Sequence, residues 1–164
     1  MVVATLSLAD GSRVRLLRSI EADVPEIVRM LADDSIASSR GDSTSVEDAA
    51  AYFRAFAAID ADPAQLLVIG RTADGDPVAT CQLTFIPGLS RAGSTRLQIE
   101  AVRVSPSLRG SGLGSALLNW ALNEGRRRGA TLAQLTSDRE RTEAHRFYER
   151  LGFVFSHAGF KRVL

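Results

Sequence analysis

The sequence predicts a single α/β (α+β) domain built on a central mixed sheet, and three observations carry this prediction. The chain has 164 residues, a comfortable length for one domain. Its 45% hydrophobic and 24% charged residues are typical of soluble globular domains. Runs with strand character alternate with stretches whose apolar residues repeat at helical spacing. Their order, ββααββ followed by βαβαβ, combines antiparallel hairpins with crossover connections.

The first half of the chain predicts two hairpins with two helices between them. The hairpin strands are expected over residues 2–8, 13–18, 65–72 and 77–86. An Asp-Gly pair lies between the strands of each hairpin, and both residue types tolerate the backbone of a tight turn. Apolar residues at spacings of 0, 3, 4 and 7 predict a helix over 21–32. Ser45 is the expected N-cap of the second helix, with Asp48 three residues later.

The second half of the chain predicts strands and helices in alternation. After a loop over 87–94 we expect a strand over 95–105, a helix over 112–128, a strand over 131–136, a helix over 142–151 and one or two strands over 153–163. The loop that joins the first of these strands to its helix is rich in glycine. Crossover helices of this kind join parallel strands.

The strand over 95–105 changes the phase of its apolar pattern. Leu97, Ile99 and Ala101 occupy odd positions, whereas Val102 and Val104 occupy even ones. This slip predicts either a β-bulge or a strand buried on both faces. A bulge would leave backbone groups unpaired, where an extended ligand can bind as an added strand does.

The glycine-rich turn after this strand has the features of an anion site. Gly110, Gly112 and Gly114 allow a ligand to approach the backbone closely, and a helix begins there. Arg109 adds a positive charge, which makes a pyrophosphate group a natural ligand. Neither the Walker A pattern nor the Rossmann spacing fits, since Ser115 stands where each requires another residue. The alternative is a glycine turn that binds nothing.

Two motifs in this half of the chain resemble the GNAT superfamily of acetyl-CoA-dependent N-acetyltransferases. The segment Arg109-Gly110-Ser111-Gly112-Leu113-Gly114 resembles the family's Arg/Gln-x-x-Gly-x-Gly/Ala motif. The segment 144–153 resembles its second signature, Ala-x-x-x-Tyr-x-x-x-Gly-Phe, and the strand over 99–104 resembles the bulged fourth strand. The resemblance implies a mostly antiparallel twisted sheet of about seven strands, with a β-bulge in strand 4 and about four flanking helices.

The resemblance also implies acetyl-CoA as the co-substrate, with no metal. The residues implied to bind coenzyme A are Val102, Arg103, Val104, Arg109, Gly110, Ser111, Gly112, Leu113, Gly114, Ser115 and Ala144. The amides of the glycine turn would hold the pyrophosphate, and the pantetheine arm would follow the bulged strand. A backbone amide at Val102 would polarise the thioester carbonyl.

Two residues are candidates for proton transfer. A primary amine has a pKa of about 10.4 and must lose a proton before it attacks, which makes Glu100 a candidate base. The alternative for Glu100 is a surface ion pair with Arg103 or another arginine. Tyr148 is the candidate acid for the departing thiolate, although its helical spacing also suits a core residue.

Two further side chains have weaker functional interpretations. Cys81 lies inside a predicted strand without a neighbouring histidine, so a buried inert thiol is favoured over an acyl-cysteine. His145 is expected to be an ordinary helix histidine rather than a contact to the cofactor or the acceptor.

The overall expectation is a single N-acetyltransferase domain over residues 1–164 that acetylates an amine by direct attack in a ternary complex. The alternative is a non-catalytic acyl-CoA sensor. Residues 21–62 contain ten acidic and three basic residues, which motivates a cationic acceptor, either a small molecule or a peptide. We expect no nucleic-acid or membrane partner and a cytoplasmic protein, and the resemblance is compatible with a homodimer.

Overall fold

The computed structural model describes residues 1–33 and 46–163, and its centre is a six-stranded sheet with the strands in chain order. The strands are β1 Val2–Ser7, β2 Arg13–Arg18, β3 Gln65–Arg71, β4 Pro77–Pro87, β5 Thr95–Val104 and β6 Ala130–Leu135. Neighbours from β1 to β5 pair antiparallel, whereas β5 and β6 pair parallel. The sheet is therefore mixed and mostly antiparallel, as the sequence predicts.

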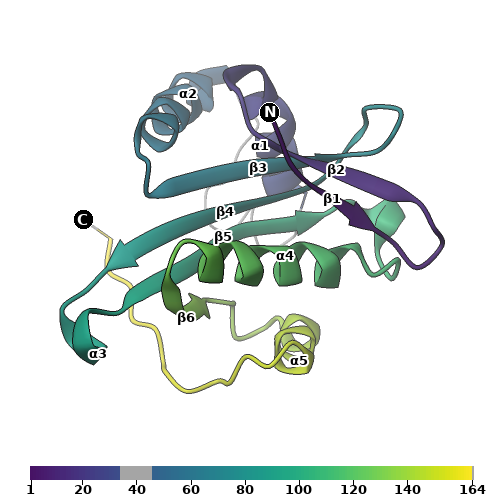
Figure 1. Ribbon diagram of the computed structural model, residues 1–164. Coiled ribbons are helices and arrows are strands. Elements are labelled where there is room, and N and C mark those ends of the chain that lie inside the picture. The colour runs from purple at the N-terminus through teal and green to yellow at the C-terminus, as the bar shows by residue number, and fades with distance from the viewer. Residues whose placement is uncertain (34–45, 164) are drawn as a thin grey trace.

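Helices lie on both faces of this sheet (Figure 1). They are α1 Val24–Ala32, α2 Val46–Ala61, the short α3 Ser90–Gly93, α4 Leu113–Arg127 and α5 Thr142–Arg150. A 3-10 turn over Glu21–Asp23 precedes α1, so the first long helix begins later than predicted. The four longer helices match the expected ranges closely.

Each face of the sheet has its own hydrophobic core. On the α4 face, β3 to β5 contribute Val68, Leu83 and Leu97, which pack with the apolar side of α4. On the opposite face, Leu67 and Ile69 of β3 pack with α1 and α2. Alternate residues of β3 therefore supply the two cores, which is the period expected of a strand covered on both sides.

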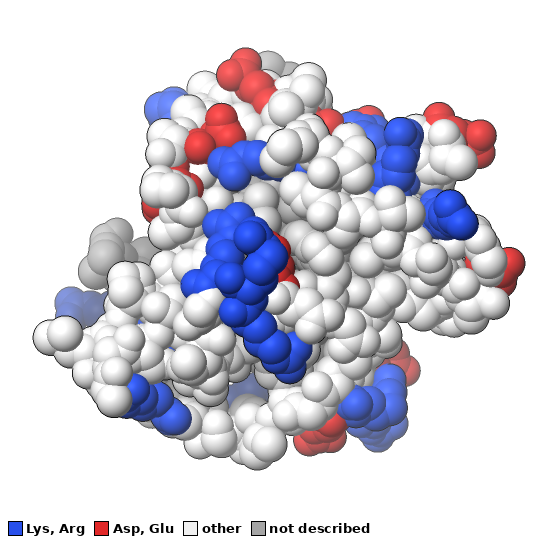
Figure 2. All heavy atoms as spheres, viewed as in Figure 1, with Lys and Arg blue, Asp and Glu red and all other residues white. Residues whose placement is uncertain are grey.

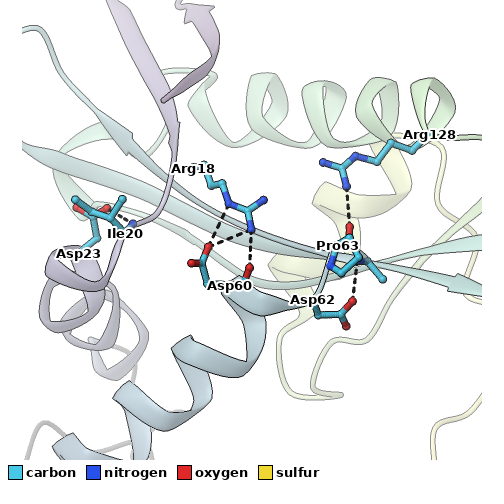
Figure 3. A network of polar contacts seen from close by, with 8 residues as sticks. Arg18, Ile20, Asp23, Asp60, Asp62, Pro63 and Arg128 are labelled. Atoms are coloured by element: carbon cyan, nitrogen blue, oxygen red, sulfur yellow. Dashed lines mark hydrogen bonds and ion pairs between the residues drawn. The ribbon is translucent and has the colours of Figure 1, made fainter.

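Hydrogen bonds and an ion pair fix the end of α2 against distant elements (Figure 3). Arg18 of β2 pairs with the Asp60 carboxylate at 3.1 Å. Arg128, which follows α4, donates to the Pro63 carbonyl at 3.3 Å and lies 4.5 Å from the centre of the Phe85 ring. These contacts join the two sides of the sheet at one end of the molecule.

Three expectations from the sequence differ from the structure or lie outside it: the strands over 153–163, the cap Ser45, and the total of about seven strands, where the described sheet has six. The strands expected over 153–163 are wrong: residues 153–163 contain no strand, and Val154, Phe155 and Phe160 are between 76% and 96% exposed. The segment 156–159 interrupts the apolar residues, so neither part offers a long alternating edge to pair. The expected cap Ser45 lies outside the described residues.

The described helices include none that is long and apolar enough to span a membrane.

Candidate functional site

The predicted bulge is present, and it lies in β5, the fifth strand, because the N-terminal hairpin supplies two strands before α1. Thr80 of β4 faces Arg103, and Gln82 faces Glu100, so Cys81 is opposite two residues. Ala101 has a φ of 54°, in the left-handed region. The bulge explains the change of phase, because Val102 and Val104 now pack toward the core on the α4 face.

Strands β5 and β6 separate just before this bulge. Their parallel pairing runs from Thr95 to Ile99, which faces Leu135, the last residue of β6. Strand β5 continues over Glu100–Val104 with β4 alone as its neighbour in the sheet. The edge of β5 beside the bulge is thus left without a β6 partner in the sheet.

The glycine turn leads directly from this edge to the N-terminus of α4. Gly110 and Gly112 have φ values of 81° and 88°, and a Cβ atom at either would meet no atom within 4 Å. The Ser111 hydroxyl donates to the Leu108 carbonyl at 2.7 Å and accepts from the Leu113 amide at 3.3 Å. The surface above the turn is therefore clear, and the serine side chain stabilises the turn itself.

The first amides of α4 are available to a ligand. A helix leaves its first N–H groups without partners inside the helix. Within the part of the chain that the structure describes, the amides of Gly112, Gly114 and Ser115 donate to no acceptor. Their dipoles and the positive helix end favour an anion at this position.

Gly114 differs from Gly110 and Gly112, because a side chain at this position would meet neighbouring residues. A Cβ atom there would lie 3.3 Å from Cζ of Phe147 and 3.8 Å from Cγ2 of Val104. The missing side chain lets the first turn of α4 pack against α5. This contact brings the second motif, which contains Tyr148, beside the glycine turn.

Tyr148 is half-buried, and its ring contacts two other aromatic rings. The ring centres of Phe147 and Phe153 lie 5.3 and 6.0 Å from it. Burial raises the pKa of the Tyr148 hydroxyl above its ordinary value of 10, while the positive charges of Arg141 and Arg103 act in the opposite direction. The hydroxyl thus keeps its proton at neutral pH, as a proton donor must.

Glu100 lies at the same end of β5 but belongs to the opposite face of the sheet. It is exposed, and its cross-strand neighbour is Gln82. Within residues 1–33 and 46–163 it forms no ion pair, and the guanidinium of Arg103 donates instead to the Val102 carbonyl at 2.9 Å. The two candidates for proton transfer thus flank the separated strands from two sides.

The other candidate residues are buried or contact only other residues of the fold. Cys81 is fully buried, and burial raises the pKa of its thiol to about 12, so the thiolate is suppressed. The ring Nε2 of His145 lies 2.7 Å from the Asp138 carbonyl oxygen, and the ring stacks on Phe155. Ala144 is half-buried in α5. The described residues contain no group of three or more His, Cys, Asp or Glu placed to hold a metal.

Sequence reasoning missed two features of this region. Arg141, the residue before α5, stands seven positions before Tyr148, about two helical turns, and its positive charge acts to lower the pKa of the Tyr148 hydroxyl. This spacing in the sequence could have indicated it. Part of the acidic excess over 21–62 is also neutralised: Asp23 and Glu26 both contact Arg71, the former at 2.7 Å. Arg71 lies outside that segment, so its position could not be inferred from the segment alone.

The model of the acetyltransferase (GNAT) family matches residues 30–153. Aminoalkylphosphonate N-acetyltransferase of Salmonella typhimurium is 43% identical over 67 residues, which are 41% of this chain and 44% of that protein. Streptothricin acetyltransferase of Streptomyces lavendulae is 32% identical over 139 residues, 85% of this chain and 62% of that protein.

The solved structures include a protein from Bacillus halodurans C-125 described as a transcriptional regulator. It is 38% identical, with a TM-score of 0.86 over 92% of this chain and 99% of that one. The matches to the two curated relatives thus span less than two thirds of their lengths, whereas this structural match spans nearly the whole solved chain.

Proposed function

Since the chain belongs to the acetyltransferase (GNAT) family, we propose that it transfers an acetyl group from acetyl-CoA to a primary amine. The observation that carries the proposal is that three structural features meet at one place. The bulged edge of β5, the separation of β5 from β6 and the N-terminus of α4 all meet there. A thioester arm needs an extended edge, and a diphosphate needs free amides, and this junction offers both.

Acetyl-CoA fits the open surface above the glycine turn. The positions where a Cβ of Gly110 or Gly112 would stand are clear of other atoms, and the first amides of α4 remain available. We expect these amides, with Arg109, to hold the pyrophosphate, and Val102 to Val104 to contact the pantetheine arm. Ser111 supports the turn instead, because its hydroxyl and its amide both donate to the Leu108 carbonyl. When bound, acetyl-CoA supplies the activated acetyl thioester.

Glu100 is proposed to accept the proton of the amine, directly or through water. An amine with a pKa of about 10.4 is almost entirely protonated at neutral pH and cannot attack. The carboxylate of Glu100 is exposed beside the bulge and has no ion pair among the described residues, which supports a free acceptor of protons. The base acts before or during attack, within the ternary complex.

Tyr148 is proposed to hold the proton that the leaving sulfur receives. Its hydroxyl is protonated at neutral pH even at the ordinary pKa of 10, and burial raises that pKa further. The charges of Arg103 and Arg141 stabilise the phenolate that remains after the proton leaves. The acceptor amine, a small molecule or a peptide, reaches the site from the face of the sheet on which Glu100 lies.

The proposal is tested by thiol release from acetyl-CoA with a panel of primary amines. The protein should release thiol above the rate of hydrolysis with at least one amine. Glu100→Gln should lower the rate at pH 7 about 100-fold, and the deficit should shrink toward pH 10, where amines lose the proton unaided. Glu149→Gln, which removes an exposed charge from α5, should leave the profile unchanged.

A non-catalytic acyl-CoA-binding module is the second candidate. It is favoured by one finding, namely that the 38% identical protein from Bacillus halodurans is described as a transcriptional regulator. Such a module would bind CoA and be stabilised by it. It would release no thiol above hydrolysis with any amine, and that result would contradict the transferase.

A further inference from the structure

A set of polar side chains lies on the sheet face opposite α4, in line with Glu100. We call it the polar row, and it consists of Gln65, Gln82, Thr84, Gln98 and Gln134. These residues come from four adjacent strands, β3 to β6. None of them belongs to the glycine turn or to the candidates for proton transfer.

The strand register places the polar row and Glu100 on one face. Gln82 faces Glu100, and Gln98 faces Thr84 on one side and Gln134 on the other. Residues paired directly across a ladder point to the same face, with Cβ atoms about 5 Å apart in antiparallel pairs. The polar row thus extends from the candidate base across the sheet.

Hydrogen bonds hold these side chains in fixed orientations. Gln82 Nε2 and Thr84 Oγ1 both donate to Gln65 Oε1, at 3.1 and 2.8 Å. Gln134 Nε2 donates to Gln98 Oε1 at 2.7 Å. Gln98 is only 9% exposed, and the other members are half-buried. The row is therefore an ordered surface rather than a set of mobile side chains.

The polar row differs from the neighbouring residues on the same sheet face, which are apolar. Leu67 and Ile69, which follow Gln65 on the same face of β3, are buried against α1 and α2 and have no polar group. Polar side chains at half-buried sheet positions stabilise a fold less than apolar side chains would. Their presence here is therefore better explained by binding than by stability. Each carboxamide has two N–H donors and an accepting oxygen, so the bonds above leave capacity for a ligand.

We propose that the polar row binds the body of the acceptor through hydrogen bonds, so that the acceptor is an amine carrying uncharged hydroxyl or amide groups. This inference rests on the proposed function, because Glu100 then marks where the amine nitrogen lies. All five members of the row are neutral, so they select hydrogen-bonding groups rather than a second charge. The acceptor's nitrogen lies at Glu100 and its polar groups extend toward Gln82 and Gln98.

The experiment compares acceptors that differ in one group, using thiol release by the full chain. Cyclohexylamine and trans-4-aminocyclohexanol have the same ring and differ by a hydroxyl remote from the nitrogen. The hydroxyl should raise kcat/KM about fivefold to tenfold, the effect of one hydrogen bond. Two further acceptors, 1,4-diaminobutane and 2-aminoethylphosphonate, test a second positive charge and a negative charge, and both should be poorer than the aminoalcohol.

Variants then locate the effect in the polar row. Gln82→Leu and Thr84→Val should each reduce the preference for the aminoalcohol to about twofold or less. Neither should change the Kd of CoA, and the readout in each variant is the ratio of kcat/KM for the two ring amines rather than the absolute rate. Thr131→Val is the matched control, because Thr131 is also a strand threonine whose hydroxyl contacts another side chain, Ser94, and it lies outside the row. The control should keep the full preference.

The outcomes separate this inference from the proposed function. Turnover with equal rates for the two ring amines, or with the diamine or the phosphonate as the best acceptor, overturns the polar row alone. A preference that survives in both Gln82→Leu and Thr84→Val overturns it as well. CoA binding without turnover of any amine overturns the proposed function and this inference together.

Discussion

The two ends of α4 show how one helix serves two purposes. At its C-terminus, the Arg128 amide donates to the carbonyls of Glu124 and Gly125, and the Gly129 amide donates to that of Arg126. At its N-terminus, the amides of Gly112 and Gly114 donate to no acceptor in the described part of the chain. The C-terminal end, whose backbone groups are hydrogen-bonded, fixes the helix in the fold. The N-terminal end, whose first amides have no acceptor, is available for a ligand.

Charged side chains are paired with one another at the C-terminal end of α4. Glu124 accepts hydrogen bonds from Arg127 at 2.7 Å and from Arg128 at 2.8 Å. Figure 2 shows a band of basic side chains over this end of α4, and further basic side chains elsewhere on the viewed face. Arginines are thus concentrated where an acidic partner already exists, so arginine density alone does not locate the candidate site.

The largest expected effect concerns Tyr148, which Gly114 and Phe147 bring beside the open end. Tyr148→Phe should lower kcat about 100-fold or more, because the variant lacks the donated proton, and should leave the Kd of CoA unchanged. The ring contacts with Phe147 and Phe153 persist in the variant. Steady-state kinetics and CoA titration measure the two quantities. An unchanged kcat would remove Tyr148 from the mechanism.

The same hydroxyl predicts part of the pH dependence. Because burial raises its pKa above 10, the proton is present throughout the neutral and mildly alkaline range. The wild-type rate should therefore show no tyrosine-dependent decrease below about pH 9, and the profile of kcat against pH checks this. A decrease near pH 8 that is absent from Tyr148→Phe would contradict the assignment.

The second prediction compares equivalent glycines at the two ends of α4. Gly112 and Gly129 both have positive φ, 88° and 81°, and a Cβ at either meets nothing within 4 Å. Gly112→Ala and Gly129→Ala should therefore each cost about 1 kcal/mol of unfolding free energy. Only Gly112→Ala should weaken CoA binding, by about 30-fold, or roughly 2 kcal/mol. Equal Kd values for the two variants would mean that the open end is not the binding surface.

A third prediction disturbs the C-terminal end of α4 alone. The hydrogen bond from Arg127 is the main cause that lowers the pKa of Glu124 below its ordinary value of 4.5, with Arg128 contributing. A lowered folded-state pKa stabilises the fold above the unfolded pKa, and this contribution is lost as pH falls through the folded value. Glu124→Gln should cost about 1 kcal/mol at pH 7 and less at pH 3. Urea unfolding at the two pH values measures this, and CoA affinity should not change.

Much of the fold could be predicted because its signals are local. Asp-Gly pairs marked both N-terminal hairpins, and the phase slip at Ala101 marked the bulge. The strands expected over 153–163 failed because apolar composition does not supply a pairing partner. The polar row was missed because Gln98 and Gln134 are 36 residues apart, and only the strand register brings them together. The roles of Glu100 and Tyr148 remain proposals.

The smallest expected effect concerns the bulge. Ala101 has a φ of 54°, where an alanine is strained and a glycine is not. Ala101→Gly should thus raise the unfolding free energy by at most about 1 kcal/mol, since glycine also gains freedom in the unfolded chain. Thermal or urea unfolding checks the sign. A marked loss of stability would mean that the alanine methyl group has a packing role.

The central claim is that the free amides at the N-terminus of α4 bind the diphosphate of CoA. The most direct test is a titration of the ¹⁵N-labelled protein with CoA, followed through the amide signals of its glycines. Binding through these amides should shift the signals of Gly110, Gly112 and Gly114 and leave those of Gly125 and Gly129 in place. Saturable binding that leaves the three turn glycines unmoved would contradict it.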